Sequence, residues 1–182
     1  MEQAYELKEE KSAQGLKFFF ISIGKKDIIK VIQYSYVQEF NGRRLYNLEF
    51  GDYDLVNDIT SDEVNTNNGD VYRVFACVLK TIPIFFENYS QCILMVQGSD
   101  SRPGFSQACK LTCSKMCGMK CKNYNRRINI YRKYIDKNFK YLSIDYQFLG
   151  GRKNKQHEML MELYKCKEAY DSVFLYKKSL TL

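Results

Sequence analysis

The sequence predicts an α+β fold in which an antiparallel three-stranded meander extends into a mixed sheet with helices packed on it. Two observations support this prediction. Near the N-terminus, three segments rich in β-branched and aromatic residues are separated by turn sequences. Farther along the chain, apolar residues recur at helical spacing. The predicted order is βββ-α-β-α-β-α-β, in a single domain that covers residues 1–182.

The meander is predicted from the spacing of turns and the alternation of side chains. Asn41-Gly42 is a hairpin signal, because both residues tolerate a positive φ. In the strand that follows it, Tyr46, Leu48 and Phe50 alternate with polar residues and so face one side. The three strands are predicted at 16–23, 28–37 and 44–50.

The rest of the chain is predicted to add helices and further strands. Asp70 is an N-cap residue in front of an apolar stripe at helical spacing, and Pro83 should kink or end that helix. A basic, helical stretch is expected to reach about residue 138. The other predicted elements are strands at 91–97, 139–149 and 171–178, an exposed linker at 150–156 and a short helix at 158–167.

Composition excludes two classes of protein. Hydrophobic residues make up 45% of the 182 residues, which is typical of a folded globular protein and not of a disordered chain. No run approaches the roughly 18 apolar residues that a membrane span needs, so no membrane partner is expected. The polar, acidic first twelve residues do not resemble a secretory signal. We therefore expect a cytoplasmic protein with reduced cysteines.

The positive charge is concentrated in one segment. Residues 1–100 contain 10 Lys and Arg against 15 Asp and Glu, whereas residues 101–155 contain 14 against 2. Such asymmetry favours a binding module whose basic segment, 102–140, contacts nucleic acid or an acidic partner protein. The interleaved cations and tyrosines suit phosphate contact and base stacking. The predicted binding residues are Ser99, Ser101, Arg102, Lys122, Arg126, Arg127, Tyr131, Arg132 and Lys133.

The turn at 98–102 is a second place where an anion could bind. It follows a predicted strand and opens a predicted helix, where backbone amides attract negative charge. Ser99, Ser101 and Arg102 would add donors there. The sequence lacks the spacing of a Walker loop, and an ordinary turn is the alternative interpretation.

Three short motifs carry a resemblance to a known family. They are YNLEFGD at 46–52, NNGD at 67–70 and Gly98-Ser99. The chain resembles a family of short, uncharacterised proteins from Bacteroidota over residues 16–100 and 126–178. The resemblance implies a fold and a bacterial, cytosolic setting but no reaction. Residues 104–125 resemble an insertion into that family's pattern, Cys-rich, basic and helical.

Four cysteines spaced four residues apart lie in this insertion: Cys109, Cys113, Cys117 and Cys121. On a continuous helix their thiols would form a line about 18 Å long, which cannot surround one zinc ion unless the helix breaks, for instance at Gly118. Pairs of thiols could bind soft ions such as Cu(I) alongside Met116 and Met119, or two copies of the helix could share a metal. Buried apolar cysteines and redox-active thiols are the other interpretations.

An enzyme hypothesis rests on aspartates at predicted strand ends. If the ends lie side by side, Asp52, Asp54 and Asp100 could hold Mg²⁺ for a phosphodiesterase or nuclease reaction. Aspartate is also an ordinary residue of turns and caps, so the same residues could be structural. The sequence names no further cofactor, and it leaves open whether the protein is an enzyme.

Overall fold

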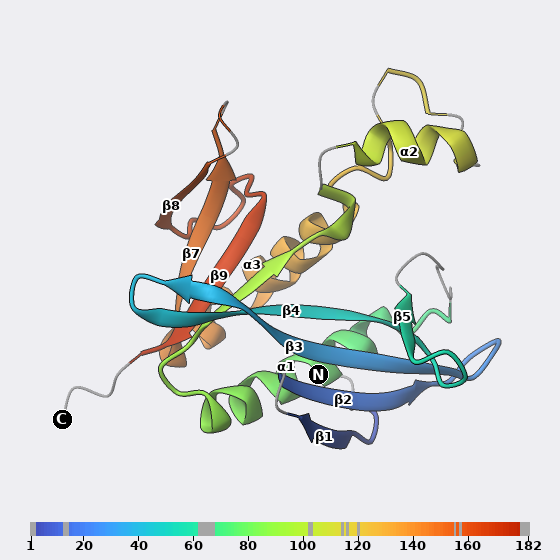
Figure 1. Ribbon diagram of the computed structural model, residues 1–182, viewed down its shortest axis with the longest axis horizontal. Coiled ribbons are helices and arrows are strands. Elements are labelled where there is room, and N and C mark those ends of the chain that lie inside the picture. The colour runs from blue at the N-terminus through green and yellow to red at the C-terminus, as the bar shows by residue number, and fades with distance from the viewer. Residues whose placement is uncertain are drawn as a thin grey trace. The chain divides into compact units, whose positions relative to one another are not determined.

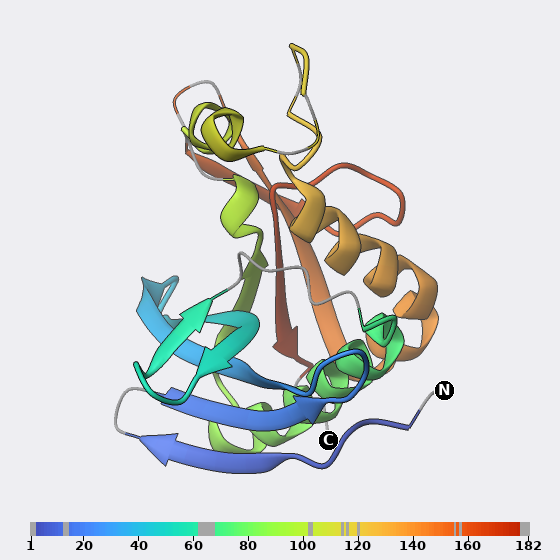
Figure 2. The ribbon, with the colours of Figure 1, turned by 90° about the vertical axis from the view of Figure 1, so that its right-hand side faces the viewer.

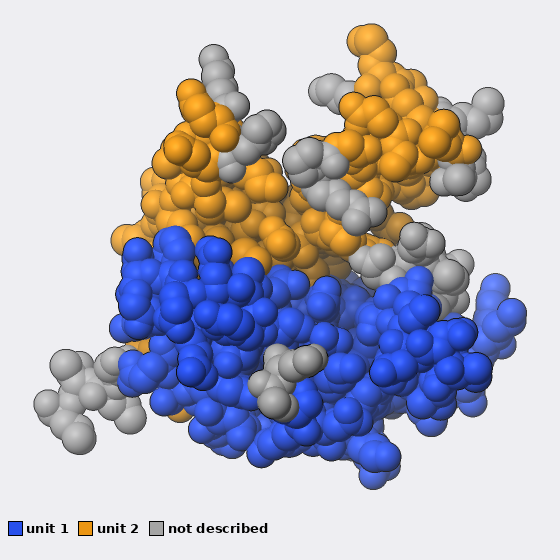
Figure 3. Space-filling model, viewed as in Figure 1, with its two compact units in different colours: residues 1–92 blue, residues 93–182 orange. Residues whose placement is uncertain are grey.

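The computed structural model describes residues 3–12, 15–61, 68–101, 104–113, 115, 117–119, 121–154, 156 and 158–178. The chain divides into two compact units, residues 1–92 and residues 93–182, which Figure 3 shows in separate colours. Each unit is described by itself. Within the described residues, no helix combines the length and the hydropathy that crossing a bilayer requires.

Unit 1 is an antiparallel meander covered by one helix (Figure 1). Its strands follow each other in the sheet in chain order, and each pairs antiparallel with the next. Asn41 and Gly42 have φ angles of 49° and 71°, which confirms the predicted hairpin turn. The strands are β1 (Lys8–Ser12), β2 (Gly15–Ser22), β3 (Ile28–Phe40), β4 (Arg43–Asp54) and β5 (Ile59–Ser61).

Helix α1 (Val71–Asn88) buries most of the predicted apolar stripe, although Val71 at its start is exposed. Phe85 stacks on Tyr34 of β3 with ring centroids 4.6 Å apart, and Phe75 meets the ring of Phe50 edge-on. The hydroxyl of Tyr34 shares a 2.7 Å hydrogen bond with Thr81, so this fully buried phenol has a partner. The helix continues through Pro83 to Asn88, which shows that burial of Phe85 and Phe86 outweighs the lost backbone hydrogen bond.

Unit 2 is an antiparallel sheet with helix α3 (Arg126–Asp145) packed against it, as the turned view of Figure 2 shows. The strand order is β6-β9-β7-β8. Ile128, Ile135 and Leu142, seven residues apart on α3, are buried. Phe139 on the same helix meets the rings of Phe148 and Tyr164. The strands are β6 (Ile93–Gln97), β7 (Tyr146–Lys153), β8 (Met159–Leu163) and β9 (Ser172–Lys177).

The α+β class, the meander and the last strand are confirmed, but several elements differ from the prediction. Residues 139–145 continue α3 and do not form a strand, because Phe139 and Leu142 lie on the buried face of the helix. Residues 159–163 form strand β8 and not a helix. Strands β1 and β5 were not expected, since β1 is exposed and β5 has three residues.

The predicted linker at 150–156 is wrong at its start, where Gly150 and Gly151 lie in the middle of β7. A Cβ on Gly150 would lie 2.1 Å from the ring of Tyr170, and one on Gly151 would lie 2.6 Å from the sulfur of Met159. With glycine at these two positions, the side chains of Tyr170 and Met159 can pack directly against the backbone of β7. Glycine here marks close packing, and not a break in the sheet.

Candidate functional site

The turn after β6 is fastened to the start of α3. It forms a short 3₁₀ helix, η1 (Ser99–Ser101), in which Asp100 is 5% exposed. Oδ2 of Asp100 accepts a 2.9 Å hydrogen bond from the backbone N–H of Arg127, and the Arg127 guanidinium donates to the hydroxyl of Ser99. The protein's own carboxylate therefore occupies the place at the N-terminus of α3 where an external anion would bind.

Among the described residues, none of the predicted donors in this turn is positioned to bind an external anion. Ser99 accepts from Arg127, and Ser101 is 9% exposed. Arg102 lies outside the described residues. The buried atoms Ser101 Oγ, Asp100 Oδ1 and Asn125 Oδ1 have no hydrogen-bond partner within the described part of the chain. Desolvation raises the pKa of Asp100 against the opposing effect of the Arg127 hydrogen bond.

The segment 104–125, which we call the cysteine lobe, is helical only in its first part. Helix α2 covers Phe105–Thr112, and Cys113 follows in an extended conformation with φ −75° and ψ 112°. The prediction of a helix through the whole lobe therefore holds for eight residues. None of the lobe's described side chains is fully buried, so no buried apolar face among them supports a longer helix. In Figures 1 and 2, α2 and the chain after it extend away from the sheet of unit 2.

Because the helix ends early, the four thiols gather instead of forming a line. The sulfurs of Cys113 and Cys117 lie 3.5 Å apart. The thiol of Cys109 interacts with those of Cys121 and Cys113. The side-chain amide of Asn123 donates to the sulfurs of Cys109 at 3.3 Å and Cys113 at 3.6 Å. Sequence reasoning missed Asn123, because nothing in its spacing indicates that the chain returns past α2.

The thiols affect one another's acidity. The Asn123 hydrogen bond lowers the pKa of Cys109, but desolvation and the interactions with Cys121 and Cys113 outweigh it, so this pKa is raised. The pKa of Cys113 is lowered, first by the backbone N–H of Lys115 and then by the thiols of Cys117 and Cys109. Opposite shifts within one cluster indicate that a proton is held at some sulfurs more readily than at others.

The four cysteines are free thiols, and their sulfurs do not have the geometry of a formed metal site. All four cysteines are half-buried and unbonded to one another. Among the described residues, no three Cys, His, Asp or Glu side chains have the arrangement of a formed metal centre. A metal would therefore have to draw the sulfurs together by side-chain rotation.

Helix α3 presents its cations on the side away from the sheet. Arg126, Lys133, Lys137 and Lys140 are exposed, and their spacing of seven, four and three residues places them on one helical face. We call these four residues the α3 stripe. Over 14 residues the stripe extends about 21 Å. The aromatic ring of Tyr141, 65% exposed, lies beside its C-terminal end.

Four other residues predicted to bind have contacts within the protein or are half-buried. Arg127 donates to Ser99, and Arg132 donates to Asn129 at 2.9 Å and to the carbonyl oxygen of Glu168. Tyr131 is half-buried on the same helix. Lys122, in the lobe, is exposed, and its ammonium donates to the carbonyl oxygen of Lys115. The α3 stripe therefore keeps Arg126 and Lys133 of the predicted residues and adds Lys137 and Lys140, which the prediction did not include.

The aspartates of the enzyme hypothesis each have a structural partner. Asp52 on β4 pairs with Lys30 of β3, whose side chain is 8% exposed. Asp54 accepts hydrogen bonds from the backbone N–H of Val56 at 2.8 Å and from Asn57. These bonds, first that of the Asn57 side chain, lower the pKa of Asp54. Both carboxylates are thus engaged in contacts within unit 1.

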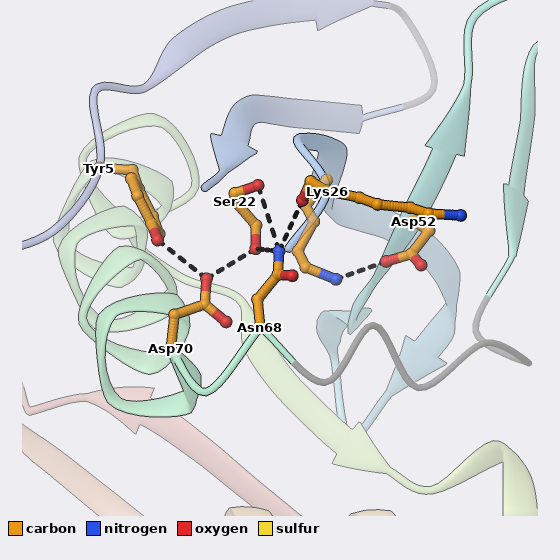
Figure 4. Close-up of polar contacts among 7 residues, drawn as sticks. Tyr5, Ser22, Lys26, Asp52, Asn68 and Asp70 are labelled. Carbon is orange, nitrogen blue, oxygen red and sulfur yellow. Dashed lines mark hydrogen bonds and ion pairs between the residues drawn. The ribbon is translucent and has the colours of Figure 1, made fainter. Parts of the chain in front are cut away.

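A polar network that sequence reasoning missed closes unit 1 near the start of α1 (Figure 4). Asp70 stands at the N-cap position, as predicted, but its side chain makes no capping hydrogen bond. Its Oδ2 accepts instead from the hydroxyls of Tyr5 at 2.9 Å and Ser22 at 2.6 Å. The amide of Asn68 donates to Ser22 and to the carbonyl oxygen of Lys26. Asn68 and Asp70 of the NNGD motif therefore tie the chain before α1 to strand β2.

Comparison with known proteins assigns the first part of the chain. A model of a family of unknown function, DUF6934, matches residues 1–103. The chain belongs to this family. No curated protein and no solved structure is significantly similar to the chain. The match contains unit 1 with its Asp70 network, and it ends just before the cysteine lobe and the α3 stripe.

Proposed function

We propose that this DUF6934 protein binds nucleic acid on the exposed face of α3, with the cysteine lobe adding cations beside it. The observation that carries the proposal is the α3 stripe, four cations on one face of a helix whose opposite face is anchored in the sheet. Because the helix is anchored, its cations already lie in a row, and the entropic cost of ordering the backbone when a polyanion binds is small.

The acidic side chains of this helix are engaged elsewhere or lie at its end. Asp136 accepts a 2.8 Å hydrogen bond from the hydroxyl of Tyr164 and another from the backbone N–H of Lys167, which directs it toward the loop before β9. Asp145 lies at the C-terminal end of the helix. The field along the stripe is therefore positive from Arg126 to Lys140, which favours phosphate groups.

Exposed aromatic rings favour nucleic acid over an acidic protein as the partner. Tyr141 is 65% exposed beside Lys140, and Tyr124 is 44% exposed where the cysteine lobe joins α3. Stacking of a base on an exposed ring contributes about 1–3 kcal/mol per base, a gain that an acidic polypeptide does not provide. Lys110, Lys115 and Lys122 of the lobe supply further exposed cations.

The test is binding of a labelled random oligonucleotide of about 20 nucleotides, a length that exceeds one binding site, measured by fluorescence anisotropy at several salt concentrations. We expect the affinity to fall steeply with salt. The triple variant Lys133→Gln, Lys137→Gln, Lys140→Gln should reduce the slope of log K against log salt by about 2, since each phosphate contact contributes roughly 0.7 on single strands.

The matched control removes three exposed lysines of unit 1, Lys8, Lys25 and Lys26, by the same substitution to Gln. This control has the same net charge as the test variant and should keep the wild-type slope. Equal losses in both variants would mean that only net charge matters, and would contradict the proposal. Tyr141→Ala should weaken oligonucleotide binding but leave binding of polyglutamate unchanged; the stronger binding of polyglutamate by the wild type would indicate an acidic protein partner.

A further inference from the structure

We propose that Cys109, Cys113, Cys117 and Cys121 bind one Zn²⁺ ion as four thiolates, and that this ion holds the cysteine lobe in a single conformation. The inference is independent of the nucleic-acid proposal, since it concerns what folds the lobe and not what the protein binds.

The lobe lacks the apolar interior that would otherwise hold it. None of its described residues belongs to the buried core, and Leu111 and Met119 are 86% and fully exposed. A segment of some twenty residues buries too little apolar surface to fold by itself, and such segments usually depend on a metal or on disulfides. The four thiols are half-buried, so they are among the least exposed groups of the lobe.

The positions of the sulfurs suit a tetrahedral ion. Two sulfurs bound at about 2.3 Å to one tetrahedral zinc lie about 3.8 Å apart. The 3.5 Å separation of the Cys113 and Cys117 sulfurs is close to that value. Cys109 interacts with both Cys113 and Cys121, so each of the four thiols reaches at least one other. On this proposal, zinc draws the four sulfurs from the present cluster into a four-sulfur site.

Hydrogen-bond donors and cations around the cluster suit thiolates better than thiols. The backbone N–H of Lys122 donates to the sulfur of Cys117 at 3.2 Å, and Asn123 donates to two further sulfurs. Such donors orient metal ligands and stabilise their charge. On binding, the four thiols release four protons and the centre carries a net charge of −2. The exposed ammonium groups of Lys110, Lys115 and Lys122 offset that charge.

Four sulfur ligands favour zinc among the common metals. The three-residue gaps between successive cysteines fall within the range found for paired zinc ligands. Carboxylate-preferring ions such as Mg²⁺ and Ca²⁺ do not suit an all-sulfur site. An iron–sulfur cluster and a pair of disulfides remain as chemically distinct outcomes, and each has its own signature in the test.

The experiment uses the full chain, purified under reducing conditions without chelator, and measures metal by elemental mass spectrometry together with free thiols. We expect about one zinc per chain. Cys113→Ser and Cys117→Ser should each lower the zinc content at least tenfold. Cys166→Ser is the matched control, because Cys166 is an exposed cysteine outside the lobe, and it should leave the zinc content unchanged.

A second measurement keeps the test decisive if a variant folds poorly. Titration of the metal-free chain with Co²⁺ should give the intense visible bands of tetrahedral cobalt bound to sulfur, and Zn²⁺ should displace them. Zinc should also slow tryptic cleavage after Lys110 and Lys115. Metal-free protein with free thiols, iron with a brown colour, or two disulfides within the lobe would each overturn the proposal.

Discussion

Burial decides what single polar residues do in this protein, and the ion pair of Lys30 and Asp52 shows it most directly. The Lys30 ammonium lies in the sheet with its side chain 8% exposed, and Asp52 on the neighbouring strand is its ionic partner. Removing one member of a buried ion pair leaves the other charge uncompensated, which costs about 3–5 kcal/mol. The same carboxylate that the sequence offers as a metal ligand is thereby a stabilising group.

We expect Asp52→Ala to lower the free energy of unfolding by about 3 kcal/mol, measured by urea denaturation. The double variant Lys30→Met, Asp52→Leu should recover most of that loss, because it removes both charges. Asp54→Ala, at an exposed carboxylate two residues away, should lower the free energy of unfolding much less. A more stable Asp52→Ala variant would show that the carboxylate is strained and held for a ligand.

Asp100 gives a pH dependence whose sign follows from its burial. Desolvation raises the folded-state pKa of Asp100 above its unfolded value of about 3.9. The folded state therefore binds this proton more tightly than the unfolded chain does. As the pH falls from neutrality through the raised pKa, Asp100 makes the protein more stable, and the gain is complete below the unfolded pKa.

The variant Asp100→Asn isolates this effect, because the amide oxygen can still accept from the Arg127 N–H but does not titrate. We expect the free energy of unfolding of the wild type, minus that of Asp100→Asn, to increase as the pH falls from 7 to 4. Urea denaturation at each pH measures this difference. Asp100→Ala should cost about 1–2 kcal/mol by removing the acceptor at the start of α3. A pH-independent difference between wild type and Asp100→Asn would contradict the assignment.

At the scale of elements, the sequence predicts those whose local pattern and tertiary burial agree. The hairpin at Asn41-Gly42 and helix α1 are in this class, because the turn residues and the apolar spacing are local signals that packing reinforces. The local pattern does not decide the end of α3. The alternation of side chains at 139–149 is typical of a strand, but Phe139 and Leu142 also lie on one face of a helix. Only the sheet beneath them decides between the two.

The candidate site could be predicted in composition but not in geometry. The cations and the four cysteines are visible in the sequence, and the α3 stripe follows from helical spacing once the helix is known. That Arg127 and Arg132 turn inward depends on Ser99 and on the carbonyl oxygen of Glu168, which lies 36 residues from Arg132 along the chain. The gathering of the thiols depends on where α2 ends, which no local residue specifies.

At the scale of the whole molecule, the cysteine lobe is a loop whose two ends lie next to each other in unit 2. The backbone N–H of Asn125 donates to the carbonyl oxygen of Asp100 at 3.3 Å, so the chain on either side of the lobe is already joined. The family match ends at residue 103, directly before the lobe. The lobe therefore adds charge and thiols to unit 2 without taking part in its core.

We therefore expect that residues 103–123 can be replaced by a four-residue Gly-Ser linker with little loss of stability. Replacing the 21 residues by four lowers the entropic cost of closing this loop by about 1.5 kcal/mol, so the urea midpoint should not fall. The same variant should bind no zinc, and its oligonucleotide affinity should depend less on salt, because Lys110, Lys115 and Lys122 are gone. Asp100→Ala in the full chain is the comparison, since it disrupts the junction itself and should destabilise more. Loss of cooperative unfolding in the linker variant, with the junction intact, would show that the lobe is part of the folding unit and that its thiols stabilise the core of unit 2.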